Sequence, residues 1–145
     1  MSETTVPLSQ PLYGATFGQA VQRFFAKYAT TGGRASRSEY WWAALAVGLV
    51  NFVFAILLLV SHGVSANTDG TFNFSPLGVV VLIIWILFEL AVIIPHISVS
   101  VRRLHDANLS GYLFLLILIP SLGGLIVFIL ALLPTNPAGS RFDVK

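Results

Sequence analysis

The sequence contains no cysteine and few charged residues. Only 10% of its 145 residues are Asp, Glu, Lys or Arg, compared with about 25% in a typical soluble domain. The absence of cysteine excludes disulfides, thiolate nucleophiles and cysteine-ligated zinc or iron–sulfur centres. Eight Lys and Arg against six Asp and Glu leave a formal charge of +2, which is too small for a nucleic-acid-binding surface. The scarcity of charge also argues against a water-soluble globule.

Long apolar runs take the place of the missing charges. Hydrophobic residues make up 56% of the chain, and the mean hydropathy is +0.84. Three runs, over residues 41–61, 77–101 and 111–133, are each long enough to cross the roughly 30 Å of a bilayer core as a helix. We therefore predict an all-α integral membrane protein with three transmembrane helices. The membrane domain covers residues 16–135, between a mobile N-terminus (1–15) and a tail (136–145).

The distribution of Lys and Arg predicts the orientation. Four cations precede the first run, none lie between the first and second runs, two follow the second run, and two lie in the tail. A cytoplasmic N-terminus places six cations inside and two outside, which satisfies the positive-inside rule. In an alternative threading the third run bends back at residues 120–124 as a re-entrant hairpin, and all eight cations lie inside.

An amphipathic helix is predicted ahead of the first run. Its apolar positions fall on one helical face: Phe17, Val21, Phe24, Phe25 and Tyr28. Arg23 and Lys27 lie on the polar side, and Thr16 with Gln19 forms a capping box. The segment is expected either to lie in the cytoplasmic membrane interface or to pack against the transmembrane helices of the same chain.

Two polar motifs border the transmembrane helices on one side of the membrane. The first, residues 33–42 (GRASRSEYWW), leads into the first run, and its Ser36 and Glu39 form a capping box that starts a helix near Arg37. The second, residues 102–112 (RRLHDANLSGY), is predicted to connect the second and third helices, with Ser110 capping the third. Both motifs face the cytoplasm in the predicted threading.

These motifs bring together a charged cluster with more cations than acids. Its members are Arg34, Arg37, Glu39, Arg102, Arg103, His105 and Asp106. One interpretation is an internal clamp in which the arginines pair with the two carboxylates. Another is a site that uses the surplus charge to hold an anion, such as an anionic lipid headgroup. A hydrolytic triad of His105, Asp106 and Ser110 is the least favoured interpretation, and we predict no enzyme activity.

Three polar residues lie inside the apolar runs: Asn51, Glu89 and His96. An acidic side chain near the middle of a bilayer costs about 2.5 to 3.5 kcal/mol on insertion scales, so Glu89 is expected to have a specific role. Glu89, His96 and Arg103 fall on one helical face, which would form a polar track for a proton or ion, or a contact with another subunit. Alternatively, a protonated Glu89 bonds to Asn51 or to a backbone carbonyl. The three histidines are spread over both sides of the membrane, so neither a metal site nor a cofactor is predicted.

The two polar motifs resemble those of a known family, the bacterial inner-membrane proteins of the domain-of-unknown-function 805 (DUF805) family. The family's G-R-x-x-R-x-E-Y-W pattern is matched at Gly33–Trp41, and its R-R-L-H-D-x-x-x-S-[GA]-[WY] pattern at Arg102–Tyr112. The chain departs from the family's frequent Asn-Arg-Phe/Tyr-Gly ending, because it reads GSRFD at residues 139–143. The resemblance implies a bacterial inner-membrane location and brings no established activity.

Together these observations predict a small, non-enzymatic inner-membrane protein with a cytoplasmic N-terminus. Its expected partners are the bilayer, anionic lipid at the arginine-rich face, and either further copies of itself or a larger membrane complex. The alternative is an oligomeric transporter or channel whose polar track contains Glu89 and His96. A membrane-embedded enzyme ranks third.

Overall fold

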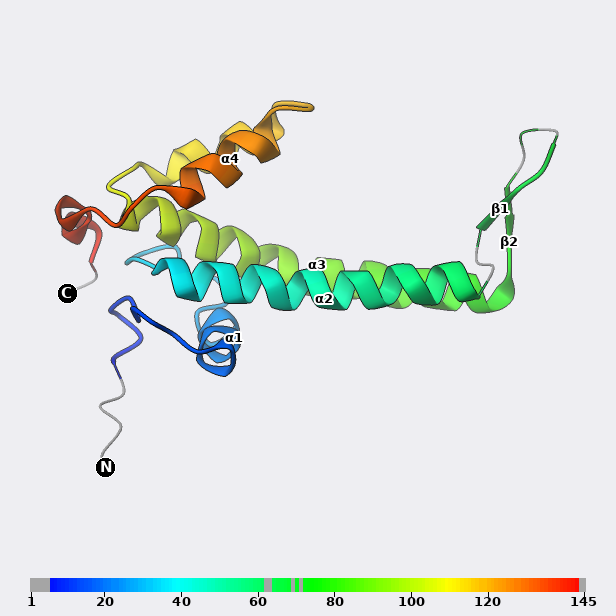
Figure 1. The fold of residues 1–145 in the computed structure, drawn as a ribbon, viewed down its shortest axis with the longest axis horizontal. Coiled ribbons are helices and arrows are strands. Elements are labelled where there is room, and N and C mark those ends of the chain that lie inside the picture. The colour runs from blue at the N-terminus through cyan, green and yellow to red at the C-terminus, as the bar shows by residue number, and fades with distance from the viewer. Residues whose placement is uncertain (1–5, 62–63, 69, 71, 144–145) are drawn as a thin grey trace. The chain divides into compact units, whose positions relative to one another are not determined.

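The computed structural model describes residues 6–61, 64–68, 70 and 72–143 (Figure 1). In chain order, its elements are α1 (Phe17–Ala26), α2 (Arg37–Val60), β1 (Val64–Ala66), β2 (Phe72–Phe74), α3 (Pro76–Asp106), the 3-10 helix η1 (Gly111–Leu118), α4 (Gly123–Leu132) and the 3-10 helix η2 (Pro137–Phe142). The chain divides into two compact units. The first contains the residues up to Ala44 and those from Ile94 onward, and the second contains Leu45–Ile93.

Helices α2 and α3 are long and apolar enough to cross a membrane. At 1.5 Å per residue, the 24 residues of α2 and the 31 residues of α3 each form a helix longer than the roughly 30 Å of a bilayer core. Few residues in their apolar stretches are buried, whereas the core helix of a soluble protein buries most of its apolar residues. Helix α2 begins at Arg37, as the Ser36–Glu39 capping box predicts: the Glu39 amide donates to Ser36 Oγ and the Ser36 amide to Glu39 Oε2.

The second unit contains α2 from Leu45 onward and α3 up to Ile93, and these two stretches run side by side (Figure 1). The indole Nε1 of Trp85 donates to Asn51 Oδ1 at 2.6 Å, and the Trp85 ring stacks on Phe54 with 6.0 Å between centroids. A hydrogen bond to a polar side chain inside an apolar helix pair fixes which faces meet. Asn51 thus has a structural partner on α3.

The loop between these helices contains a short antiparallel ribbon that the all-α prediction does not include. Strand β1 pairs with β2 in the register Val64↔Phe74, Ser65↔Asn73 and Ala66↔Phe72. The Gly70 amide donates to the Asn67 carbonyl, and Gly70 has φ +82°. This left-handed conformation suits glycine and closes the turn.

The third apolar run is not one helix, so the prediction of a continuous helix over 111–133 is wrong. The run folds into η1 and α4, which pack against each other as a hairpin (Figure 1). Ser121 has φ +68°, and a Cβ at Gly123 would collide with the Leu116 carbonyl oxygen. The bend lies at residues 120–124, as in the alternative threading. The ten residues of α4 span about 15 Å, half of a bilayer core.

The second polar motif is also not a simple loop. Helix α3 continues through Arg102, and its last turn contains Arg103 and His105 before the helix ends at Asp106. Basic side chains in the last turn stabilise a helix through its dipole. Asn108, with φ +60°, provides the left-handed residue at which helices commonly end.

Helix α1 begins with the predicted capping box, since Thr16 Oγ1 accepts from the Gln19 amide and the Gln19 side chain accepts from the Thr16 amide. Its orientation, however, differs from expectation. Ala20, Arg23, Phe24 and Lys27 are buried, whereas Phe17, Phe25 and Tyr28 are exposed. Of the five predicted apolar positions, only Phe24 is therefore fully buried, and the two cations face the protein instead of water.

The segment before α1 is held in place by hydrogen bonds. The amides of Leu12 and Ala15 donate to Glu39 and Ser38, and the Tyr13 hydroxyl donates to Asp106. Mobility is predicted for residues 1–15. Residues 6–15 belong to the first unit and make the bonds given above, and residues 1–5 lie outside the described part of the chain.

Candidate functional site

Most of the described charged residues of the first unit form two groups, each centred on a buried carboxylate. We call the first the Asp106 cluster, which consists of Tyr13, Arg34, Arg103, Asp106, Thr135 and Asp143. We call the second the Glu39 cluster, which consists of Arg23, Lys27, Glu39 and Arg102. Five of the seven residues predicted to form one cluster are divided between these two groups, and Arg37 and His105 belong to neither.

In the Asp106 cluster, the fully buried Asp106 side chain accepts hydrogen bonds from several elements. Its Oδ2 accepts from Arg103 Nη1 at 2.6 Å and from Thr135 Oγ1 at 2.7 Å, and its Oδ1 accepts from the Tyr13 hydroxyl at 2.8 Å. Burial and the hydrogen bond to Asp106 raise the pKa of Tyr13 to about 12. The carboxylate thus joins the N-terminal segment, α3 and the residues after α4.

The two arginines of the Asp106 cluster are fully engaged. The Arg34 guanidinium forms a bidentate pair with Asp143, with both N···O distances 2.7 Å, and this pairing raises the pKa of Arg34. The remaining nitrogens of Arg103 donate to the backbone carbonyls of Ala131 and Leu133, which lie at the end of α4. Such paired and fork-shaped contacts are the strongest that arginine makes.

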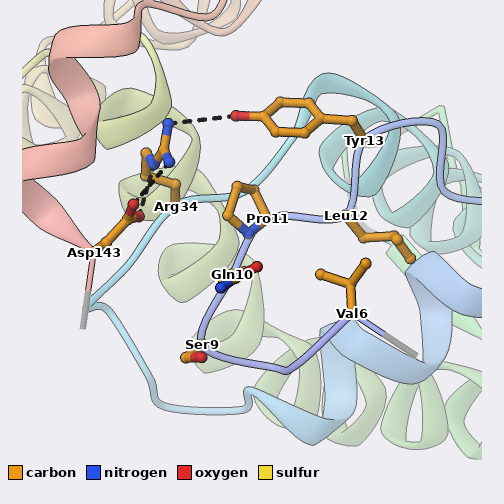
Figure 2. Close-up of a pocket in the computed structure, with 8 residues that line it drawn as sticks. All are labelled: Val6, Ser9, Gln10, Pro11, Leu12, Tyr13, Arg34 and Asp143. Atoms are coloured by element: carbon orange, nitrogen blue, oxygen red, sulfur yellow. Dashed lines mark hydrogen bonds and ion pairs between the residues drawn. The ribbon is translucent and has the colours of Figure 1, made fainter. Parts of the chain in front are cut away.

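A hollow of about 550 Å³ lies beside this cluster, lined by the N-terminal segment and by Arg34 and Asp143 (Figure 2). Among the described residues of its lining, Arg34 and Asp143 are the charged side chains, and they pair with each other. These described residues therefore leave no uncompensated charge in the hollow to select an ion. The geometry of the Asp106 cluster matches the internal clamp among the sequence-based interpretations.

His105 belongs to the same structural region but contacts different groups. Its Nδ1 lies 3.0 Å from the Gly33 carbonyl oxygen, and its ring stacks on Phe142 with 4.1 Å between centroids. Ser110 Oγ accepts from the Tyr112 amide as the cap of η1. His105, Asp106 and Ser110 thus have three separate sets of partners, which is not the relay that a hydrolytic triad requires.

In the Glu39 cluster, the carboxylate holds the start of α2 and the buried face of α1 together. Arg23 Nε donates to Glu39 Oε1, while the amides of Ser36 and Leu12 donate to Oε2 at 2.9 and 3.1 Å. The other nitrogens of Arg23 donate to backbone carbonyls of the N-terminal segment, those of Val6, Pro7 and Gln10. Both Glu39 and Arg23 are therefore saturated.

The Glu39 cluster contains two further buried cations, Lys27 and Arg102. Lys27 is 4% exposed, and burial, assisted by the charge of Arg102, lowers the pKa of its ammonium to about 8. Arg102 is 1% exposed, and its Nε and Nη2 are buried without a hydrogen-bond partner in the described part of the chain. With three cations and one acid, the cluster has a surplus of two positive charges.

The sequence interpretation missed Arg23 and Lys27 as site residues and included Arg37, which lies at the edge of the Asp106 cluster. Arg37 is exposed, and its Nε donates at 3.1 Å to the Leu133 carbonyl, which also accepts from Arg103. Arg23, in α1, and Lys27, its C-cap, are four residues apart, a spacing that places two residues on one helical face. That spacing was a usable signal, but the amphipathic pattern assigned this face to water.

The polar residues of the apolar helices have separate surroundings. Glu89 is exposed on the second-unit part of α3, whereas His96 belongs to the first unit and its backbone carbonyl accepts from Ser100 Oγ. Asn51 Oδ1 is bonded to Trp85, so the expected bond between Glu89 and Asn51 is not among those that the described residues form.

Comparisons with known proteins give a consistent family assignment. A family model described as a protein of unknown function (DUF805) matches residues 28–144. The chain is 31% identical over 110 residues to the inner membrane protein YhaH of Escherichia coli strain K12, covering 76% of this chain and 81% of YhaH. It is 28% identical over 102 residues to the inner membrane protein YhaI of the same strain, covering 70% and 73% of the two chains. No solved structure gives a significant match.

Proposed function

Because the chain belongs to the DUF805 family of proteins of unknown function, as its two motifs predict, we propose that it is a non-enzymatic component of the bacterial inner membrane whose arginine-rich cytoplasmic end associates with anionic lipid. The location is supported by its relatives YhaH and YhaI, which are inner membrane proteins. The family provides no activity, so the association with lipid is argued from the surfaces and charges of this chain.

The proposed topology has two membrane-crossing helices and both termini in the cytoplasm. Helices α2 and α3 cross the bilayer, and the η1–α4 hairpin enters the membrane from the cytoplasmic side and returns to it. The chain between α2 and α3 contains no Lys or Arg, so this threading places all eight cations inside, in accordance with the positive-inside rule. A third complete crossing would leave Arg141 and Lys145 outside.

The orientation of α1 is the observation that carries the proposal. Its exposed side presents Phe17, Phe25 and Tyr28, while its cations point into the protein. Aromatic side chains are favoured at the level of the lipid headgroups, where amphipathic helices insert their apolar face. In water the same arrangement would expose the aromatic rings and bury the charges. Helix α1 is thus suited to lie in the cytoplasmic interface.

The topology can be tested with single cysteines, because the chain has none of its own. In whole cells, Thr68→Cys should react with a membrane-impermeant maleimide, whereas Ser140→Cys should react only after permeabilisation. Both positions are exposed. Labelling of Ser140→Cys in intact cells would contradict the two-crossing topology.

The interfacial position of α1 can be tested with an environment-sensitive fluorophore on Phe25→Cys in nanodiscs. Brominated lipid should quench this fluorophore strongly, and aqueous iodide only weakly. The same fluorophore on the exposed Ser140→Cys is the matched control, and it should show the reverse. If iodide quenched both positions equally, α1 would not lie in the interface and the proposal would fail.

A second candidate function is supported by Glu89. Its side chain is exposed on α3 among the exposed Ile86, Leu90 and Ile93, where a lone carboxylate facing lipid costs about 2.5 to 3.5 kcal/mol. A contact with a further copy of the chain or with another subunit would remove this cost, and an oligomer is also what the alternative of a Glu89/His96 transport track requires. Glu89→Gln should then change the stoichiometry seen by native mass spectrometry. An unchanged stoichiometry, together with proteoliposome flux equal to that of empty vesicles, would reject this candidate.

A further inference from the structure

The guanidinium of Arg102 is buried in the first unit and forms no ion pair with the residues that the structure describes. Its Nε and Nη2, which form one edge of the guanidinium fork, have no hydrogen-bond acceptor in the described part of the chain, and the residue is 1% exposed. Leaving charged donors buried and unpaired is strongly destabilising. A native protein tolerates this arrangement when another group completes it.

The Glu39 cluster has no further carboxylate that could accept from Nε and Nη2 of Arg102. Glu39 lies within electrostatic range of Arg102, but both of its oxygens accept from other groups, Oε1 from Arg23 and Oε2 from two backbone amides. Arg34 and Arg103, in contrast, each have an aspartate partner. Arg102 is thus the buried arginine whose fork remains unoccupied.

Lys27 adds a second buried cation to the same place. The charges that act on its ammonium are those of Arg102, Glu39 and Arg23, so among the described residues Glu39 is the only acid in its surroundings. Burial and the charge of Arg102 lower the pKa of Lys27 to about 8, the direction expected for a buried ammonium beside another cation. A bound anion would offset both the charge of Lys27 and that of Arg102.

We infer that the Glu39 cluster is a binding site for a phosphate-bearing anion, held by the Nε–Nη2 edge of Arg102 and by the ammonium of Lys27. The guanidinium edge matches two phosphate oxygens, and lysine binds phosphate as a point charge. Either a lipid headgroup or a free phosphate offers this chemistry. The lipid source rests on the proposed function, because α1 would then place the cluster at headgroup depth.

The site can be tested first with inorganic phosphate. The full chain is reconstituted in nanodiscs of phosphatidylcholine, and its thermal unfolding midpoint is measured during a phosphate titration at constant ionic strength. A ligand that binds only the folded state raises the midpoint with its concentration. The midpoint should rise by several degrees for the unaltered chain and for Arg141→Gln, a matched loss of an exposed cation, but not for Arg102→Gln.

Folding of the test variant is a separate readout. Without phosphate, Arg102→Gln should unfold at the same temperature as the unaltered chain or higher, because it removes an uncompensated buried charge. Lys27→Gln should likewise reduce the rise of the unfolding midpoint with phosphate. It replaces Arg102→Gln as the test variant if Arg102→Gln fails to fold. If the unaltered chain gives no shift, or if both variants respond as it does, the inference is wrong.

Native mass spectrometry distinguishes the two sources of phosphate and separates this inference from the proposed function. In nanodiscs that contain phosphatidylglycerol, the unaltered chain and Arg141→Gln should retain this lipid, and Arg102→Gln should lose it. If free phosphate binds but the lipid is not retained, the site stands and the association with anionic lipid fails. If Arg102→Gln retains the lipid fully and also responds to phosphate, the association with lipid stands and the site is rejected.

Discussion

The Asp106 and Glu39 clusters have similar components but differ in how completely their charges are paired. Each has a buried carboxylate and buried arginines, and both lie in the first unit. In the Asp106 cluster, Arg34 and Arg103 pair with Asp143 and Asp106. In the Glu39 cluster, Arg23 alone pairs with the carboxylate, and Arg102 has two nitrogens without acceptors.

Two buried clusters built from the same residue types can therefore differ in whether their charges are fully paired. A fully paired buried network fixes the elements that it joins, because any rearrangement leaves a charge or donor unsatisfied. A cluster with surplus charge is stabilised by a ligand of the opposite sign. The division of roles between the two clusters leads to the following expected outcomes, ordered by the size of the effect.

The largest effect is expected from Asp106→Ala. The substitution leaves the buried Arg103 guanidinium without its carboxylate and removes the acceptor of Tyr13 and Thr135. We expect a loss of about 3–5 kcal/mol in the free energy of unfolding, as for other broken buried pairs. Unfolding in detergent or nanodiscs measures it. Asp143→Ala, which removes a more exposed partner of Arg34, should cost only about 1 kcal/mol; equal losses would mean that Asp106 is not the centre of the clamp.

Gly139→Ala should disturb the Asp106 cluster by steric means. A Cβ at Gly139 would collide with the His105 carbonyl oxygen and would lie 3.4 Å from the Arg34 side chain. Overpacking of this kind costs about 1–3 kcal/mol, measurable as a lower unfolding midpoint. Gly18→Ala is the control in α1, where a Cβ meets nothing within 4 Å. A destabilisation of similar size in both variants would point to a general effect of removing glycine.

The pH dependence of stability should distinguish the clusters. Because the pKa of Lys27 falls from 10.5 to about 8 in the folded state, the cost of burying its charge is fully present below pH 8. Between pH 8 and 10.5 the unfolded chain binds more protons, so stability should rise with pH. Unfolding midpoints across this window should show the rise, and Lys27→Met should remove it. A rise that persists in Lys27→Met would assign it to another group.

The smallest effect is expected at Tyr13. Loss of its hydrogen bond to Asp106 in Tyr13→Phe should cost about 1 kcal/mol. The pKa of Tyr13 rises from 10.0 to about 12 on folding. Its contribution is therefore fully present below pH 10 and should be lost as the pH rises from 10 to 12, opposite in sign to that of Lys27. If the alkaline loss of stability is unchanged in Tyr13→Phe, this assignment is incorrect.

Much of the local structure was predictable from the sequence, because it depends on neighbouring residues. The capping boxes at Thr16 and Ser36 start α1 and α2 as expected, and the apolar runs predict the two long helices. The break at residues 120–124 was predictable only as an alternative. Residues 120–124 (PSLGG) are compatible with a bend, but helices with neighbours tolerate Pro and Gly. The deciding features are the left-handed Ser121 and the close approach at Gly123.

The distribution of charges between the clusters could not be predicted in the same way. The partners of Glu39 and Asp106 come from segments far apart in the sequence, such as Arg23 for one and Thr135 for the other. Amphipathic periodicity also assigned the cationic face of α1 to the outside, because it assumes that water is the solvent for polar side chains. In α1, Arg23 instead faces the buried carboxylate of Glu39, so the assumption fails there.

Leu12 and Tyr13 are successive residues, and one donates to Glu39 while the other donates to Asp106. Two successive residues thus connect two carboxylates that belong to different helices, Glu39 in α2 and Asp106 in α3. Energetic coupling between them follows, because releasing either contact loosens the segment that makes the other. In a double-mutant cycle on the two carboxylates, the changes in the free energy of unfolding should accordingly be non-additive. A ligand bound at one carboxylate would also change the stability of the contacts at the other.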